Sequence, residues 1–137
     1  QSVSEVASGG EISRLMLSLK ALIAHAMALP SIVFDEVDTG VSGEIADKMA
    51  GIMREMAECM QVISITHLPQ VASLGQTHYR VYKSDTETST ATHLIKLSEK
   101  ERIEEIARML SGSSLTAAAL DNACELLKRN DLKDGKK

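Results

Sequence analysis

Apolar residues recur at helical spacing in the first part of the chain, between positions 12 and 26. The run begins behind Ser8-Gly9-Gly10-Glu11, whose Ser-x-x-Glu spacing is that of a helix capping box. Pro30 follows the run and is a typical stop signal. We therefore predict a helix from about Glu11 to Ala28. Its apolar positions are Ile12, Leu15, Met16, Leu19, Leu22, Ile23 and Ala26.

Two short apolar runs come next, 31–34 and 61–65, and each is typical of a strand buried on both faces of a parallel sheet. Residues 39–43 read as a loop between them, and 68–74 as a short helix after Pro69. A second long helix is predicted between the strands. Its apolar face consists of Ala46, Met49, Ala50, Met53, Ala57 and Met60.

The pattern changes in the second half of the chain. Residues 79–84 and 90–97 alternate as two strands of a hairpin around the polar turn 85–88. Helical spacing then returns with Ile103, Ile106, Ala107 and Leu110, and 111–114 interrupts it. A last helix is predicted from about 116 to 128. Residues 130–137 are charged and poor in apolar residues, so we expect them to form a disordered tail after a lobe spanning 1–129.

Strands that alternate with helices predict an α/β fold with parallel pairing and right-handed crossovers. We expect a three-layer lobe with a mostly parallel sheet, an added antiparallel hairpin and C-terminal helices. Ligands of such sheets bind at the carboxyl ends of the strands. Asp35-Glu36 and Thr66-His67 both follow predicted strands, so they are expected to share one site.

The adjacent acids suit phosphate chemistry. One carboxylate at a sheet edge can hold Mg²⁺ through water, and the next, which points elsewhere, can orient an attacking water. Asp35 is the predicted metal residue and Glu36 the predicted base. The alternative is that both are solvated loop acids, or that they favour the start of the following helix.

Ser8, Gly9 and Gly10 form a possible phosphate cradle, because glycine permits close backbone approach and a helix N-terminus carries partial positive charge. An ordinary capped helix start is the alternative. His67 follows the second strand and can bond a terminal phosphate or an attacking water. Its alternative is a structural histidine.

Composition narrows the class of protein. The 137 residues are 44% apolar, which suffices for a core, but only 2% aromatic, which argues against a platform for stacking single-stranded bases. The net charge of -4 lacks the basic footprint of a nucleic-acid binder. Two distant cysteines, Cys59 and Cys124, suggest free thiols in a reducing cytoplasm.

No Gly-x-x-x-x-Gly-Lys-Ser/Thr loop occurs in the sequence, and the first residue is Gln1. We therefore expect the chain to be a piece of a longer protein. No apolar stretch reaches the length of a transmembrane helix, so no membrane partner is expected.

The motifs resemble those of ATP-binding-cassette and SMC-type ATPase heads, a P-loop NTPase architecture. Residues 7–14 are similar to the signature motif, 33–36 to the Walker B strand, 37–41 to the D-loop, and Thr66-His67 to the switch histidine. Three longer strings, 34–43, 66–72 and 105–112, are similar to the RecN family of bacterial DNA repair proteins. The resemblance extends from about Val3 to Leu127.

This resemblance implies the C-terminal half of a head that binds ATP and Mg²⁺. Asp35 would serve the metal, Glu36 would be the catalytic base, and His67 would sense the γ-phosphate. Ser8, Gly9, Gly10 and Glu11 would reach ATP held by the opposite head, with Asp38 at the interface between heads.

The implied partners are an N-terminal half that carries the Walker A loop, a second head in an ATP-dependent homodimer, and DNA bound by the full-length protein. A cytoplasmic, nucleoid-associated role in double-strand break and recombinational repair would follow. Two alternatives remain open: a non-catalytic docking or dimerisation lobe, and the head of another SMC-like or RecF-like protein.

Overall fold

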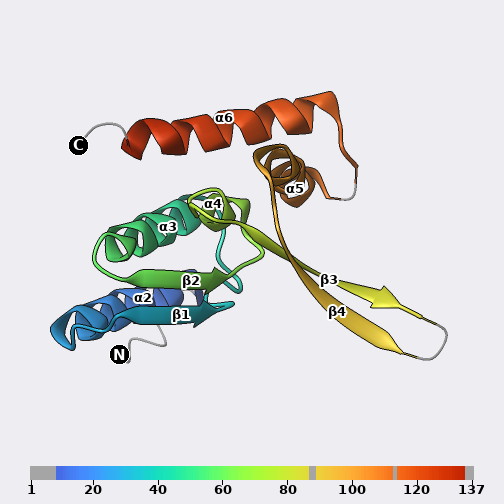
Figure 1. Cartoon of the computed structure of the whole chain (residues 1–137). Helices are drawn as coiled ribbons and strands as arrows, with labels where there is room; N and C mark the ends of the chain where they lie inside the picture. Colours follow the sequence, from blue (N-terminus) through green and yellow to red (C-terminus); the bar gives the residue numbers. More distant parts are fainter. Residues whose placement is uncertain (1–8, 87–88, 113, 135–137) are drawn as a thin grey trace. The chain divides into compact units, whose positions relative to one another are not determined.

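The computed structural model of the chain describes residues 9–86, 89–112 and 114–134, with side chains as far as Asn130. Helices and strands follow one another in the predicted order (Figure 1). The chain divides into two compact units, residues 1–74 and 75–137.

Within its described residues, 9–74, the first unit contains a parallel pair of strands and three helices. The elements are α2 (Gly9–Ala26), β1 (Ser31–Asp35), α3 (Gly43–Ala57), β2 (Gln61–Ile65) and α4 (Pro69–Ala72). The strands pair in parallel, with Ser31 opposite Gln61 and Asp35 opposite Ile65. A parallel pair needs a crossover connection, which α3 supplies. The predicted α/β class and parallel pairing are confirmed.

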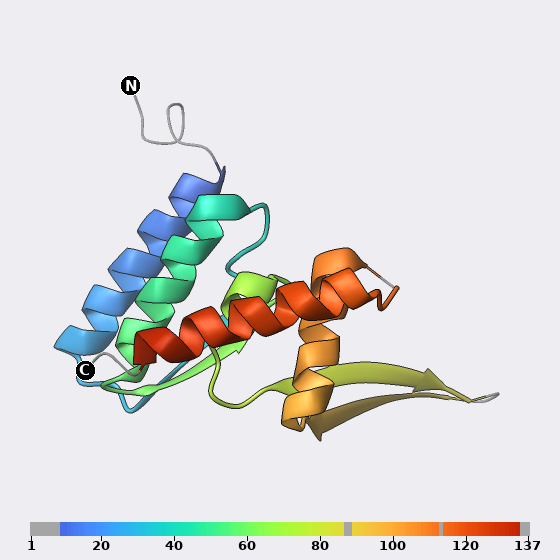
Figure 2. The ribbon, with the colours of Figure 1, turned by 90° about the horizontal axis from the view of Figure 1, so that it is seen from above.

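The core of this unit lies between one face of the sheet and the helices. Phe34 is its largest fully buried side chain, and α2 and α3 run side by side (Figure 2). The predicted apolar face of α3 is confirmed except at its end, where Met56 is buried instead of Ala57, and Met60 lies beyond the helix. The buried cluster consists of Leu17, Ala24, Phe34, Val41, Ala46, Met49, Ala50, Met53, Met56 and Val71.

The other face of the sheet is exposed. Val33 of β1 is 59% exposed, and Ile63 and Ile65 of β2 are 46% and 49% exposed. The prediction that both strands are buried on both faces is therefore wrong for the described residues. Alternate strand residues point to opposite faces, and only one face is covered by helices of this unit.

The apolar stripe of α2 is also exposed. The buried residues of the helix are Gly10, Leu17 and Ala24, on the side away from the predicted stripe. Five large apolar side chains of α2, and that of Met27 directly after the helix, are thus left on the surface, and we call this set the α2 stripe. Its members are Leu15, Met16, Leu19, Leu22, Ile23 and Met27.

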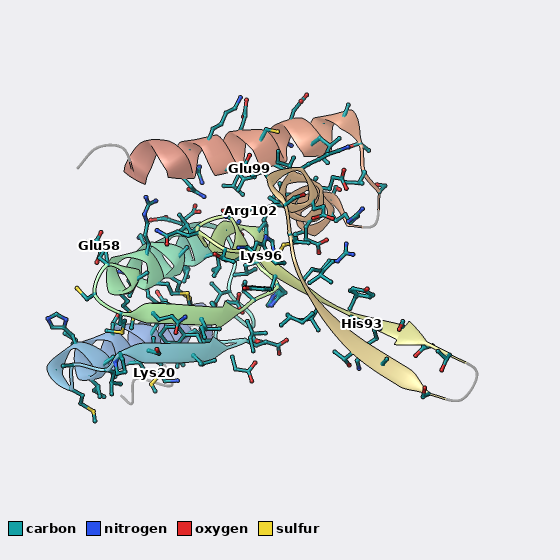
Figure 3. All side chains as sticks on the ribbon, in the orientation of Figure 1. Lys20, Glu58, His93, Lys96, Glu99 and Arg102 are labelled. Carbon is teal, nitrogen blue, oxygen red and sulfur yellow. The ribbon has the colours of Figure 1, made fainter. Side chains whose placement is uncertain are left out.

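The described part of the second unit contains the predicted hairpin and two helices. Strands β3 (Tyr79–Asp85) and β4 (Thr90–Lys96) are antiparallel, which confirms the hairpin. Helix α5 (Glu99–Ser111) packs on α6 (Ala117–Asp134). Lys96 ends β4, and Glu99 and Arg102 lie in the first turn of α5 (Figure 3).

Helix α6 is longer than predicted. It continues past Lys128 to Asp134, so residues 130–134, expected in a disordered tail, are helical. The side chain of Asn130 is buried, at 6% exposure. Charged residues can lie on the solvent side of a helix. Their number after Lys128 therefore did not reveal that α6 continues to Asp134. Among the described residues, no helix combines the length and hydropathy needed to cross a membrane.

Candidate functional site

The two predicted pairs leave the sheet at the same edge. Asp35 is the last residue of β1 and lies opposite Ile65, the last residue of β2. The backbone N–H of Glu36 donates to the carbonyl of Ile65 at 2.9 Å. Asp35 and Glu36 are both exposed. Their carboxylates are therefore accessible to a ligand at the carboxyl end of the sheet, beside the point where Thr66 and His67 begin.

A buried carboxylate stands behind this edge. Asp38 is 1% exposed, and its Oδ2 accepts a hydrogen bond from the hydroxyl of Thr66. The Nδ1 atom of His67 lies 3.6 Å from Asp38 Oδ1, within ion-pair distance but too long for a hydrogen bond. The Thr66 hydroxyl also accepts from the N–H of Leu68 at 3.0 Å.

The His67 ring is accessible to a ligand even though its Nδ1 atom lies near Asp38. The His67 side chain is 56% exposed, in contrast to its buried partner. Asp38 Oδ1 has no hydrogen-bond donor among the described residues. A carboxyl group buried in this way needs polar partners nearby. Thr66 and His67 are the groups that the structure places there.

The turn after β1 fixes the direction of Glu36. Its φ of +47° lies in the left-handed region, which is uncommon for a residue with a side chain. The hydroxyl and the N–H of Thr39 donate to the carbonyl of Glu36, at 3.0 and 3.4 Å. The N–H of Val41 donates to the carbonyl of Asp38 at 3.0 Å. The backbone on both sides of Glu36 is therefore held by hydrogen bonds.

The start of α2 lies beside this turn. A β-carbon at Gly10 would come 3.3 Å from Ile45 Cδ1 of α3 and 3.9 Å from the carbonyl oxygen of Gly40. Gly10 thus allows α2 to approach the turn closely. Gly9 faces open space, and Glu11 lies exposed in the first turn of the helix. Ser8, the first residue of the predicted cradle, lies outside the described residues.

The start of α2 has some, but not all, of the features of an anion-binding site. The first N–H groups of a helix lack intrahelical acceptors and carry partial positive charge. Gly9 leaves room for a ligand, whereas Gly10 has a packing role against Ile45.

Asp35 is the one predicted metal residue. No group of three or more His, Cys, Asp or Glu side chains within the described ranges could hold a metal ion. A single exposed carboxylate suits Mg²⁺, which keeps several waters and takes only one or two protein carboxylates alongside phosphate oxygens. The exposed Asp35 carboxylate therefore fits the protein's share of such a magnesium site.

The sequence placed Thr66 beside the site without a contact of its own and gave no role to Thr39, and the family resemblance placed Asp38 at the interface between heads. The structure shows that the Asp38 side chain is buried and that Thr66 and His67 of the same chain are its partners. The signal in the sequence was a hydroxyl residue directly before His67, at the end of a strand.

Curated relatives match nearly all of the chain. It is 46% identical over 125 residues to the DNA repair protein RecN of Rickettsia conorii, and 43% identical over 127 residues to RecN of Vibrio cholerae. It is 44% identical over 131 residues to RecN of Bacillus subtilis. These alignments cover 91%, 93% and 96% of the chain. The chain spans only 23% of the length of each of these three relatives.

A solved structure from work on ATP-driven dimerization and DNA-stimulated activation of SMC ATPases has the same fold. The TM-score is 0.63 at 19% sequence identity, and the match covers 81% of this chain and 66% of that one. At this identity the likeness concerns the fold alone. A scan against models of known protein families finds no match.

Proposed function

Because the chain belongs to the RecN family, as the segment that covers the C-terminal end of those proteins, we propose that it is the C-terminal half of an ATPase head. In this proposal the full-length protein binds and hydrolyses ATP, and the present segment supplies the water-activating residues. One observation carries the proposal: Glu36 and His67 follow paired parallel strands at one sheet edge, behind which Asp38 is buried.

Hydrolysis of a phosphoanhydride needs an oriented water and neutralised phosphate charge. Glu36 is the base that orients and deprotonates the attacking water, and its backbone is fixed by Thr39 and Ile65. His67 is the sensor of the γ-phosphate, with its exposed ring directed by Asp38. Ser8, Gly9, Gly10 and Glu11 contact the ATP of the opposite head. Asp35 is the residue that would hold Mg²⁺ through water, and the ion would supply charge neutralisation at the phosphates.

The exposed apolar surfaces of the first unit support an N-terminal partner. Large contiguous apolar patches on a soluble chain typically mark interaction sites. The α2 stripe and the open sheet face with Val33, Ile63 and Ile65 are such surfaces. We assign them to the N-terminal half of the same protein, which would carry the Gly-x-x-x-x-Gly-Lys-Ser/Thr loop that this sequence lacks.

At the level of the whole protein, two heads form an ATP-dependent homodimer, and the full-length molecule acts on DNA in double-strand break and recombinational repair. The full-length protein is cytoplasmic and associated with the nucleoid in this proposal. The names of the curated relatives support DNA repair, and the SMC fold neighbour supports a head whose dimerisation depends on ATP.

The test is reconstitution. This chain is co-expressed with the N-terminal half of its parent protein, the complex is purified, and steady-state ATP hydrolysis is measured with each half alone as control. Activity that appears only in the complex supports the half-head. A well-formed complex that neither binds nor hydrolyses ATP, with or without DNA, contradicts it and favours a docking lobe.

A further inference from the structure

We propose that Asp38 is a positioning residue that orients the ring of His67 from within the same chain. This inference rests on the proposed function, because His67 has a catalytic role only if the head hydrolyses ATP. It assigns Asp38 a task different from the interface between heads that the sequence suggested. The D-loop turn would then hold both groups that act on the γ-phosphate and its water.

The contacts of Asp38 carry the argument. Oδ2 accepts a hydrogen bond from the Thr66 hydroxyl, whereas Oδ1 makes no hydrogen bond among the described residues and lies 3.6 Å from His67 Nδ1. The side chain is 1% exposed. A residue so deeply enclosed has almost no surface left for a partner molecule, whereas its two oxygens are directed at residues that are consecutive in sequence.

A carboxylate beside one ring nitrogen of a histidine determines which tautomer the imidazole adopts, and so whether the other ring nitrogen can accept a hydrogen bond. Placing negative charge near Nδ1 favours the tautomer in which Nδ1 carries the proton and faces the carboxylate. Nε2 is then directed outward, and the 56% exposure of the His67 side chain leaves it accessible. Metal-bound histidines are oriented by a hydrogen bond to a carboxylate, and its loss typically costs roughly 10–100-fold in function; Asp38 acts on His67 by charge from 3.6 Å.

Thr66 is the second half of this device. Its hydroxyl donates to Asp38 and accepts from the N–H of Leu68 at 3.0 Å, so the hydrogen of the hydroxyl is committed to the carboxylate. This pins the backbone on both sides of His67 to Asp38. The contacts of Asp38 and Thr66 therefore fix both the backbone position of His67 and the orientation of its ring.

Asp38 also belongs to the turn that holds Glu36. Thr39, the next residue, donates to the carbonyl of Glu36 at 3.0 Å, and the carbonyl of Asp38 accepts from Val41 at 3.0 Å. Movement of this turn would shift Glu36 and His67 together. Asp38 thus connects the base and the sensor through a short stretch of one chain.

The first experiment uses the full-length protein and a double-mutant cycle. Asp38→Asn keeps the size of the side chain but removes its charge. We expect it to lower kcat for ATP about 10–100-fold with a change in KM below about 3-fold. In a His67→Ala background the same substitution should change kcat less than about 2-fold, because its target is gone. An Asp38→Asn effect of the same size in both backgrounds would overturn the inference.

Thr66 gives a matched pair that tests the same claim if Asp38 variants fold poorly. Thr66→Val removes the hydroxyl at nearly constant shape, and Thr66→Ser retains it. We expect Thr66→Val to lower kcat at least about 5-fold and Thr66→Ser to stay within about 2-fold of the wild type. Equal activity of the two variants would contradict the proposed role of the hydroxyl and of the carboxylate that it fixes.

Mixed dimers separate action within one chain from action across the interface. Asp38→Asn and His67→Ala copies carrying different tags are co-expressed, and the heterodimer is isolated. If Asp38 acts in its own chain, both sites are impaired and activity stays low. If it acts on the opposite head, one site is intact and activity returns to about half of the wild type, which would overturn the inference. Wild-type protein without ATPase activity would instead refute the proposed function itself.

Discussion

The backbone N–H of Glu36 donates to the carbonyl of Ile65 at 2.9 Å, one residue beyond the paired strands. This bond continues the parallel pairing of β1 and β2 up to the residue before Thr66. The base and the sensor of the proposed site are therefore tied to each other through the backbone. Their relative position depends on the register of the sheet and on the turn that follows Glu36.

Thr39 holds this turn. Replacing it by valine removes the hydroxyl that donates to the carbonyl of Glu36, where the backbone has a φ of +47°. We expect Thr39→Val to lower the free energy of unfolding by about 0.5–1.5 kcal/mol and to reduce ATP turnover of the full-length protein. Thr39→Ser keeps the hydroxyl and should behave like the wild type. Urea unfolding and steady-state hydrolysis measure the two effects, and equal turnover of the two variants would contradict the role given to Thr39.

The α2 stripe should matter for assembly and little for the stability of the chain. Leu22 is 68% exposed, so Leu22→Ser is expected to change the free energy of unfolding by no more than about 0.5 kcal/mol. Met49 is fully buried in α3, and Met49→Ala should cost about 2–5 kcal/mol.

Binding to the N-terminal half should depend on the apolar side chains of the α2 stripe and not on exposed polar residues of the same helix. Leu22→Ser should weaken the complex measured by pull-down or calorimetry, whereas Lys20→Ser, a polar change at an exposed position of the same helix, should not. Equal binding of the Leu22 and Lys20 variants would show that the α2 stripe is not the contact surface.

The start of α5 is stabilised by a capping box. The Ser98 hydroxyl accepts from the N–H of Glu101, and the Glu101 carboxylate accepts from the N–H of Ser98 at 2.8 Å. Ser98→Ala should lower the free energy of unfolding by about 1 kcal/mol. Glu101→Gln retains an acceptor at the same position and serves as the control, with a smaller loss expected at neutral pH.

The same box has a pH dependence of defined sign. The Ser98 backbone N–H and hydroxyl lower the pKa of Glu101 below its usual value of 4.5. A carboxyl with a lowered folded-state pKa stabilises the fold above its unfolded pKa and loses that contribution on acidification. The stability of the wild type should therefore fall below about pH 4.5 more steeply than that of Glu101→Gln, as measured by thermal melts between pH 3 and pH 6, values that bracket roughly this range. Parallel curves would contradict this.

His78 gives a second pH dependence at higher pH. Burial, with a smaller contribution from Arg102, lowers its pKa below the usual 6.5. The unfolded chain then binds a proton that the folded chain does not, so stability should decrease as the pH falls through about 6.5. His78→Gln should flatten the stability curve between about pH 7 and pH 5, and the exposed His25 changed in the same way should not. A wild-type curve without slope in this window would refute the assignment.

The spacing of apolar residues predicted the helices and strands well, because this spacing and the residues that end an element, such as proline, act over short stretches of the chain. Pro30 and Pro69 mark the ends and starts of helices, and the polar turn before Thr90 separates two alternating runs. The parallel pair and the hairpin followed from these local signals together with the order of the elements.

The burial of particular side chains could not be predicted in the same way. Leu15 and Leu22 belong to the apolar positions that predicted the first helix, but they are exposed, and Leu17 and Ala24 on the opposite side of the helix are buried. A stripe predicts that something covers it, and the sequence does not state whether the cover comes from the same unit. The open sheet face with Val33 has the same explanation.

The location of the candidate residues at the strand ends was predicted from the sequence, but the contacts among their side chains were not. Asp35, Glu36 and His67 stand where strand ends placed them. The pairing of Asp38 with Thr66 joins residues 28 positions apart, and only the folded turn brings them together. A buried carboxylate and an exposed one look alike in a sequence, so the different surroundings of Asp35 and Asp38 became visible only in the structure.

The most direct measurement is ATP turnover by the full-length protein with Glu36→Gln. Loss of a positioned base typically costs 10²–10⁴-fold in rate, so we expect kcat to fall by at least about 100-fold. ATP binding and ATP-dependent dimerisation should remain, because glutamine keeps the size of the side chain. Turnover near the wild-type value with normal ATP binding would contradict the account, since the base would then lie elsewhere than at the end of β1.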